Sequence, residues 1–149
     1  AIYRVFSDNI PAFAAPDPLP RLDIINVGVD WGGNGSAHAM VATGMTSDYG
    51  KLIALRSERV PATGLTPQQI YKRIYEFCEG ILRDYGKIED IYADSAEQTL
   101  IAGLREYINP LDLTVKNARK RPIIESICGQ HRASWERGNP GRLFCGFQG

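Results

Sequence analysis

The spacing of apolar residues changes abruptly along the chain, and this change limits the folds that are open to it. Residues 23–30, 37–45 and 51–60 have the apolar content and the short connections of three successive strands. From Thr66 onward the apolar residues recur every three or four positions instead, which predicts helices. Three connected strands followed by helices indicate an α/β domain whose first strands form an antiparallel meander.

Local signals refine these elements. Thr66-Pro67-Gln68-Gln69 has the spacing of a capping box, and Gly86 is a typical helix stop. Ser95-Ala96-Glu97-Gln98 has the same capping-box spacing before a second helix. Strict alternation in the third strand predicts one face made of Leu52, Ala54 and Arg56 and another made of Ile53, Leu55 and Ser57.

The later elements alternate between strand and helix. We expect a strand at residues 88–93 that leads into Asp94, then a helix, a short strand at 113–115, a third helix that opens at Pro122 and a last strand at 142–147. This is the order of a ribonuclease-H-like mixed sheet, with three antiparallel strands followed by alternating helix and strand. In that layout the first strand is central, and the strand after the first helix lies beside it.

Both of those neighbouring strands end in an aspartate, Asp30 and Asp94. Two carboxylates that lie close together repel each other, and a divalent cation such as Mg²⁺ or Mn²⁺ relieves the repulsion through the oxygen ligands that it prefers. Two such ions, about 3.5–4 Å apart, can activate a water and stabilise the leaving oxygen of a phosphodiester. The pair therefore predicts metal-dependent phosphoryl transfer.

Each candidate residue also has a purely structural role open to it. Asp30 could cap the glycine-rich turn at residues 31–36, and the charge of Asp94 could suit the dipole of the helix that follows. Glu97 could cap that helix or lie on its solvated surface. Alternatively, it could bind a metal ion or a water. His38 alternates within the second strand and is predicted to be structural.

Charge is distributed unevenly along a chain whose net charge is zero. Residues 1–115 carry 10 Lys and Arg against 15 Asp and Glu, whereas residues 116–149 carry 7 against 2. Such a basic segment is typical either of a surface for a polyanion or of an ordinary solvated face. The candidate DNA-binding residues in it are Lys116, Arg119, Lys120 and Arg121.

Length and composition suit one domain with a substantial core, because the chain has 149 residues of which 44% are apolar. The proline-rich residues 1–22 are predicted to be a linker or arm, which leaves residues 23–149 as the domain.

The three cysteines lack the spacing of a zinc site or a disulfide framework, and a reduced, cytosolic setting is the better interpretation. No apolar run reaches membrane-spanning length. Both ends of the sequence look cut, so we expect a piece of a longer protein.

Two acidic segments and a basic one resemble a known family. The sequence Val27-Gly28-Val29-Asp30-Trp31-Gly32-Gly33-Asn34-Gly35-Ser36-Ala37-His38-Ala39 resembles the opening strand and turn of the nuclease domain in tailed-phage terminase large subunits. Tyr92-Ala93-Asp94-Ser95-Ala96-Glu97 resembles the second acidic motif of that family, and Lys116-Asn117-Ala118-Arg119-Lys120 resembles its basic segment. The similarity runs from about residue 24 to about residue 127.

The resemblance implies a two-metal-ion endodeoxyribonuclease that cuts concatemeric double-stranded DNA during genome packaging. It implies that Asp30 and Asp94 hold Mg²⁺ or Mn²⁺. It also implies an ATPase motor domain ahead of the nuclease, with the portal and the small terminase subunit as further partners. The setting would be the cytoplasm of a bacterial host.

The chain departs from the family in its last third, where the family supplies a third acidic ligand from a late helix. No aspartate follows Asp112, and only Glu125 and Glu136 remain, neither in a matching motif. The domain is therefore C-terminally incomplete or diverged, and weak metal binding and cleavage are expected. The alternatives are a catalytically weak or inactive DNA-binding remnant, or an actin-like or sugar-kinase-type ATPase, which would need a second phosphate motif and a longer chain.

Overall fold

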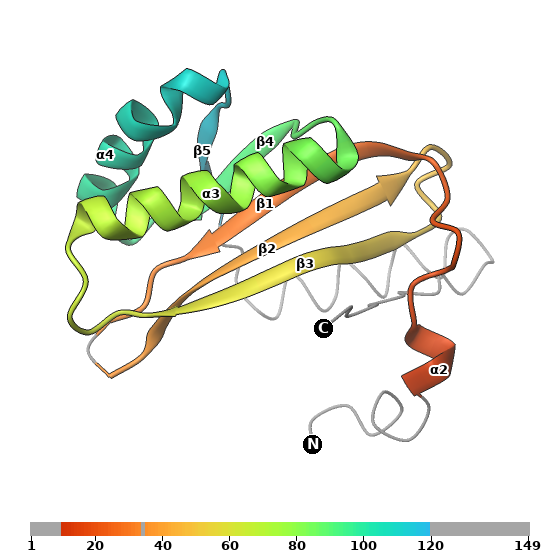
Figure 1. Ribbon diagram of the computed structural model, residues 1–149, viewed down its shortest axis with the longest axis horizontal. Coiled ribbons are helices and arrows are strands. Elements are labelled where there is room, and N and C mark those ends of the chain that lie inside the picture. Colours follow the sequence, from red (N-terminus) through yellow and green to blue (C-terminus); the bar gives the residue numbers. More distant parts are fainter. Residues whose placement is uncertain (1–9, 34, 120–149) are drawn as a thin grey trace.

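A computed structural model describes residues 10–33 and 35–119 of the protein (Figure 1). The elements are a short helix α2, five strands, two long helices and one 3₁₀ turn. In chain order they are α2 (Ile10–Phe13), β1 (Leu22–Asp30), β2 (Ala37–Thr46), β3 (Leu52–Pro61), α3 (Pro67–Tyr85), β4 (Asp90–Asp94), α4 (Gln98–Ile108), η1 (Asn109–Leu111) and β5 (Val115–Ala118). The predicted third helix and last strand lie outside the described residues.

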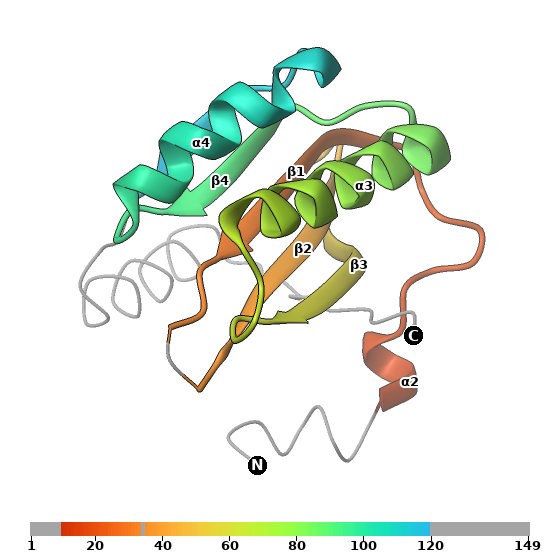
Figure 2. The same cartoon turned by 60° about the vertical axis from the view of Figure 1, so that its left-hand side comes forward.

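The strands form one mixed sheet in the order β3-β2-β1-β4-β5. β1 is central, pairs antiparallel with β2 and pairs parallel with β4. Helices α3 and α4 lie side by side over the same face of the sheet (Figure 2). The element order therefore predicted correctly both the central strand and its parallel neighbour.

The core lies between this face and the two helices. Alternate residues of β1, namely Ile25, Val27 and Val29, are buried toward α3, as the strand periodicity of two requires. The helix contributes a stripe spaced by three or four residues, which includes Ile70, Ile74, Phe77 and Ile81. The other face of the sheet carries the intervening residues, among them Asp30 and Asp94, and we call it the carboxylate face.

The ends of α3 are the ones that the sequence predicted. The Thr66 side chain accepts a hydrogen bond from the Gln69 backbone N–H at 3.3 Å, and the Gln69 side chain accepts one from the Thr66 backbone N–H at 2.8 Å. Gly86 ends the helix in the left-handed conformation with φ 84°, which favours glycine. These contacts confirm the capping box and the glycine stop.

The second predicted capping box is wrong. α4 begins at Gln98 with Glu97 as its N-cap, and Glu97 makes no side-chain capping hydrogen bond. The Gln98 side chain instead donates to the Ser95 carbonyl at 2.7 Å, which uses the glutamine outside the capping-box geometry. β5 also starts later than predicted, at Val115, because η1 and the left-handed Asp112 (φ 55°) lengthen the connection from α4.

The predicted faces of β3 are wrong beyond Leu55. Ala42 pairs with Arg56 while Thr43 pairs with Ala54, so Leu55 is an extra residue and forms a bulge. The bulge moves Arg56 to the helix-covered face, where its guanidinium pairs with Asp84 of α3. It also moves Ser57 to the carboxylate face, opposite Val41.

The segment before β1 includes residues that contact the domain. Ala15 and Leu19 are partly buried against the core, and Leu22 already belongs to β1. The boundary between an arm and a domain near residue 22 stays a prediction. Within the described part of the chain, no helix is long and apolar enough to cross a membrane.

Candidate functional site

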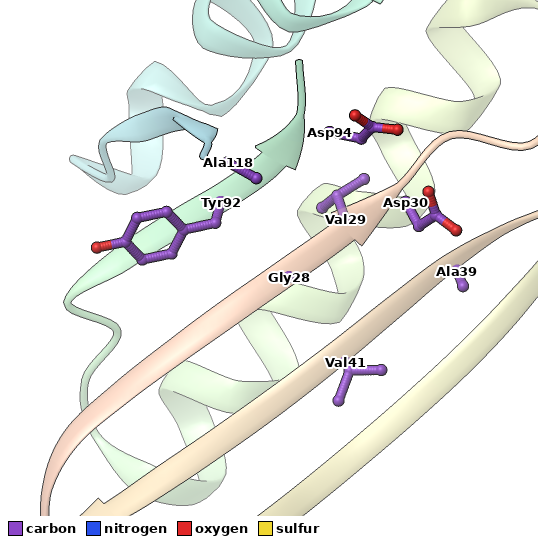
Figure 3. Close-up of a pocket in the computed structure, with 8 residues that line it drawn as sticks. All are labelled: Gly28, Val29, Asp30, Ala39, Val41, Tyr92, Asp94 and Ala118. Carbon is purple, nitrogen blue, oxygen red and sulfur yellow. The ribbon is translucent and has the colours of Figure 1, made fainter. Parts of the chain in front are cut away.

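The sheet brings Asp30 and Asp94 together at one edge. Val29 of β1 is paired in parallel with Ala93 of β4, and each aspartate is the next residue along its strand. Both side chains line one open hollow of about 450 Å³. Figure 3 shows them at the same end of the two neighbouring strands.

Small residues form much of the hollow's floor. Gly28, Ala39 and Ala118 come from three different strands, and Tyr92 and Val41 stand beside them (Figure 3). An extended ligand could lie low across the sheet here, because glycine and alanine keep the backbone surface accessible. The hollow thus combines two carboxylates with room for a chain-like ligand.

The two carboxylates have different surroundings. Asp30 is exposed, so water solvates it, and it does not carry the burial penalty that a charge at a strand end could suffer. Asp94 is half-buried, and its Oδ1 accepts a hydrogen bond from the Ala96 backbone N–H at 3.2 Å. This local turn orients the Asp94 carboxylate at the start of the loop into α4.

The turn after Asp30 is held by His38. The Gly32 backbone N–H donates to His38 Nδ1 at 3.2 Å, and the ring of Trp31 meets the imidazole edge to face at 6.0 Å between centroids. A Cβ at Gly32 would lie 2.3 Å from the carbonyl carbon of Ala37, so the close approach of two backbone segments requires glycine there. These contacts give Asp30 a defined position, and they confirm the structural role predicted for His38.

Burial lowers the pKa of His38 below its ordinary value, and the negative charge of Asp30 acts in the opposite direction. The hydrogen bond from Gly32 needs an unprotonated Nδ1, which agrees with a neutral ring. His38 therefore supports the turn as a neutral acceptor.

Glu97 is exposed at the start of α4 and does not line the hollow with Asp30 and Asp94. Within residues 10–33 and 35–119, no group of three or more His, Cys, Asp and Glu side chains could hold a metal ion. Glu125 and Glu136, the late acidic residues, lie outside the described residues.

The basic edge of the sheet adjoins the hollow. Lys116 and Arg119 line a second hollow of about 650 Å³, together with Asn117, and Tyr92 and Ala118 line both hollows. Lys120 and Arg121 lie outside the described residues. The structure thus places two of the four predicted DNA-binding residues in a hollow that adjoins the one lined by the carboxylates.

A hydrogen-bonded cluster supports this edge. Lys116 Nζ pairs with Asp90 Oδ2 at 2.7 Å, and the hydrogen bond raises the pKa of Lys116. The Tyr92 hydroxyl donates to the same oxygen at 3.3 Å, which helps to hold its exposed ring over the sheet. Sequence reasoning missed Tyr92, although its place two residues before Asp94 puts both on the same face of β4.

Solved structures of similar fold come from phages and from human cytomegalovirus. The large-terminase nuclease domain of bacteriophage SPP1, with bound Mn, has a TM-score of 0.54 and 19% identity over 85% of this chain and 62% of that chain. The large terminase of a thermophilic bacteriophage, in complex with ATP-γ-S, has a TM-score of 0.65 and 16% identity over 91% of this chain and 32% of that chain. The human cytomegalovirus terminase nuclease domain, Mn-soaked and inhibitor-bound, has a TM-score of 0.58 and 9% identity over 93% and 73%.

The chain has the ribonuclease-H-like α/β fold, as its element order predicted. More particularly, its fold is that of terminase large-subunit nuclease domains, which the two acidic segments had also indicated. No protein-family model matches the chain, and no curated protein matches it in sequence. The chain spans 62% of the SPP1 domain and about a third of the thermophilic-phage terminase.

Proposed function

We propose that this chain is a metal-dependent DNA endonuclease domain of a terminase large subunit, which cuts concatemeric DNA during genome packaging. The observation that carries the proposal is the placement of Asp30 and Asp94 at the ends of adjacent parallel strands, over one open hollow. The fold shared with terminase nuclease domains supports the same interpretation.

Asp30 and Asp94 are the residues that would bind the metal. Their oxygens suit hard divalent cations, and Mg²⁺ or Mn²⁺ would supply an activated water and stabilise the leaving oxygen of a phosphodiester. The turn held by His38 and the Asp94–Ala96 hydrogen bond would orient the two carboxylates. Lys116 and Arg119 would hold DNA phosphates beside them.

Two carboxylates bind a divalent ion more weakly than three, since each added anionic ligand strengthens the site. The described residues supply Asp30 and Asp94, and no group of three acidic side chains that could hold a metal ion occurs among them. The second candidate function, a DNA-binding remnant with weak or no cleavage, follows from this observation.

The biological setting is part of the same proposal. Double-stranded DNA would be the substrate, and an ATPase motor domain, the portal and the small terminase subunit would be the partners. The thermophilic-phage protein, of which this chain covers 32%, is a large terminase solved with ATP-γ-S. The cytoplasm of a bacterial host would be the place of action.

Nicking of supercoiled plasmid tests the proposal. We expect the full chain to nick DNA with Mn²⁺ or Mg²⁺ and to stop when EDTA removes the metal. Asp30→Asn and Asp94→Asn should each lower the nicking activity by more than about 100-fold. Changes in residues that only support a metal ligand cost roughly 10–100-fold, and these two variants remove the ligand itself.

Asp112→Asn is the matched control. It removes the same charge at an exposed residue in the left-handed conformation, which asparagine also adopts readily. Full activity of Asp30→Asn would contradict the proposal. Metal-independent DNA binding without any nicking by the wild type would favour the remnant instead.

A further inference from the structure

Arg59 lies on the carboxylate face, in the same cross-strand row as Asp30. The pairing runs from Asp30 to Ala39 and from Ala39 to Arg59, and residues directly opposite each other in an antiparallel pair stand on one face of the sheet. Ala39 lines the hollow with both aspartates. The sequence pattern could not show this row, because the bulge at Leu55 resets the faces of β3.

Arg59 has the properties of a group that meets a ligand. It is exposed, and its side chain makes no hydrogen bond or ion pair with a residue that the structure describes. Two strand spacings put its Cα about 10 Å from that of Asp30. The single residue between them is Ala39, so no large side chain stands on the surface between Arg59 and Asp30.

Cations therefore lie on both flanks of the aspartate pair, toward β3 and toward β5. Lys116 and Arg119 stand on the β5 side and Arg59 on the β3 side. A polyanion that approaches Asp30 and Asp94 is repelled by them, and a cation on each side offsets this repulsion. The guanidinium group can also bind a phosphate through two parallel hydrogen bonds.

The geometry points to Arg59 as a phosphate-binding residue that positions a DNA strand running across the sheet, from β3 over the carboxylates to the basic edge at β5. This inference rests on the proposed function, because it takes DNA as the ligand of the hollow. It adds a second anchor, on the side of the carboxylates opposite to Lys116 and Arg119. Arg59 binds the DNA backbone and takes no part in the cleavage step, so it is a positioning residue.

Fluorescence anisotropy with a labelled duplex of about 30 bp in EDTA, over a series of salt concentrations, tests the inference. Arg59→Gln should weaken binding roughly 3- to 10-fold and reduce the slope of log K against log salt by about 0.9, because one phosphate is no longer neutralised. Arg59→Lys should keep the slope, because the charge remains.

Arg83→Gln is the matched control. Arg83 is an exposed arginine on α3, on the helix-covered side of the sheet, and its removal changes the net charge equally. Modification of arginines by phenylglyoxal, read by mass spectrometry on the wild type, gives a second measurement: DNA should protect Arg59 and leave Arg83 reactive.

The outcomes separate the two proposals. If wild-type protein binds DNA while Arg59→Gln behaves like Arg83→Gln and DNA leaves Arg59 unprotected, the inference falls and the proposed function stands. If the wild type neither binds DNA at any salt concentration nor nicks plasmid with Mn²⁺, the proposed function falls and the inference falls with it. If it nicks plasmid with Mn²⁺ but does not bind the duplex in EDTA, only the inference falls.

Discussion

Three residues around Asp30 show how one side chain is held at the end of a strand. Gly32 allows the backbone to pass against Ala37, and its N–H donates to His38. His38 is 4% exposed, so the imidazole is positioned by its neighbours and not by water. A neutral, buried histidine near the start of β2 thus holds the turn that follows Asp30.

The buried His38 should make stability depend on pH. Its pKa is lowered in the folded protein, so the unfolded chain binds the proton more readily. The neutral ring contributes fully to the free energy of unfolding above pH 6.5, the pKa of histidine in the unfolded chain. This contribution is lost as the pH falls through the lower pKa of the folded protein. Wild type should therefore lose stability between about pH 7.5 and about pH 5.5 that the variant His38→Gln does not lose.

Urea unfolding of both proteins at about pH 7.5, 6.5 and 5.5 measures this difference. Titrations of the carboxylates are shared by the two proteins and cancel in the comparison. The wild type should be the more stable at the highest pH, and its advantage should shrink on acidification. A difference in stability that stays constant over this range would show that the pKa of His38 is the same in the folded and unfolded protein.

Helix ends show at the element scale why two similar sequence signals had different outcomes. Thr66 and Gln69 form both reciprocal bonds of the capping box, and the glutamine of the second motif turns back to the Ser95 carbonyl. Pro67 after Thr66 sets φ for the first helical residue, whereas the second motif has no such residue. The chain at Ser95 must also leave β4 from Asp94, whose own carboxylate bonds the Ala96 N–H.

The two caps predict different costs on substitution. Thr66→Ala should lower the free energy of unfolding by about 1 kcal/mol, because it removes an acceptor for the Gln69 N–H. Ser95→Ala should cost less than about 0.5 kcal/mol, since the N-cap of α4 is Glu97 and not Ser95. Denaturant unfolding measures both, and equal losses would contradict the assigned caps.

At the scale of the whole molecule, charge is arranged around the sheet and not only along the chain. The basic residues after Val115 begin on β5, which the sheet order places two strands from β1. Lys116 is already paired with Asp90, so part of the positive charge there is neutralised inside the protein. The other candidate DNA-binding residues are Arg119, Lys120 and Arg121. Their removal should therefore lower the affinity for DNA the most.

Neutralising these three residues to glutamine should weaken DNA binding and flatten its salt dependence. Each phosphate that is no longer neutralised reduces the slope of log K against log salt by about 0.9, so three of them would reduce it by roughly 2.7. The control replaces Lys72, Arg73 and Arg83 on α3, which removes the same charge from the helix-covered side. Binding that does not respond to salt, or equal losses in both triple variants, would count against a phosphate-contacting edge.

Much of the fold could be predicted because its signals are local. Apolar alternation marked the strands, the 3.6-residue period marked α3 and α4, and the order of the elements predicted β1 as the centre beside β4. The meeting of Asp30 and Asp94 follows from that order, since parallel neighbours end at the same edge. The bounds of β4 and β5 were less accurate, because short strands carry few residues with a pattern.

The sequence by itself determined the types of the elements, the caps of α3 and the two aspartates at strand ends, because each depends on residues close together in the chain. Tertiary pairing alone decided what else stands around those aspartates. The Leu55 bulge put Arg56 against α3 and Arg59 beside the hollow, and the β4–β5 pairing joined Lys116 to Asp90. The physical reason is that a strand's periodicity assigns side chains to two alternate faces, whereas the partner strand decides where that alternation breaks and which side chains become neighbours.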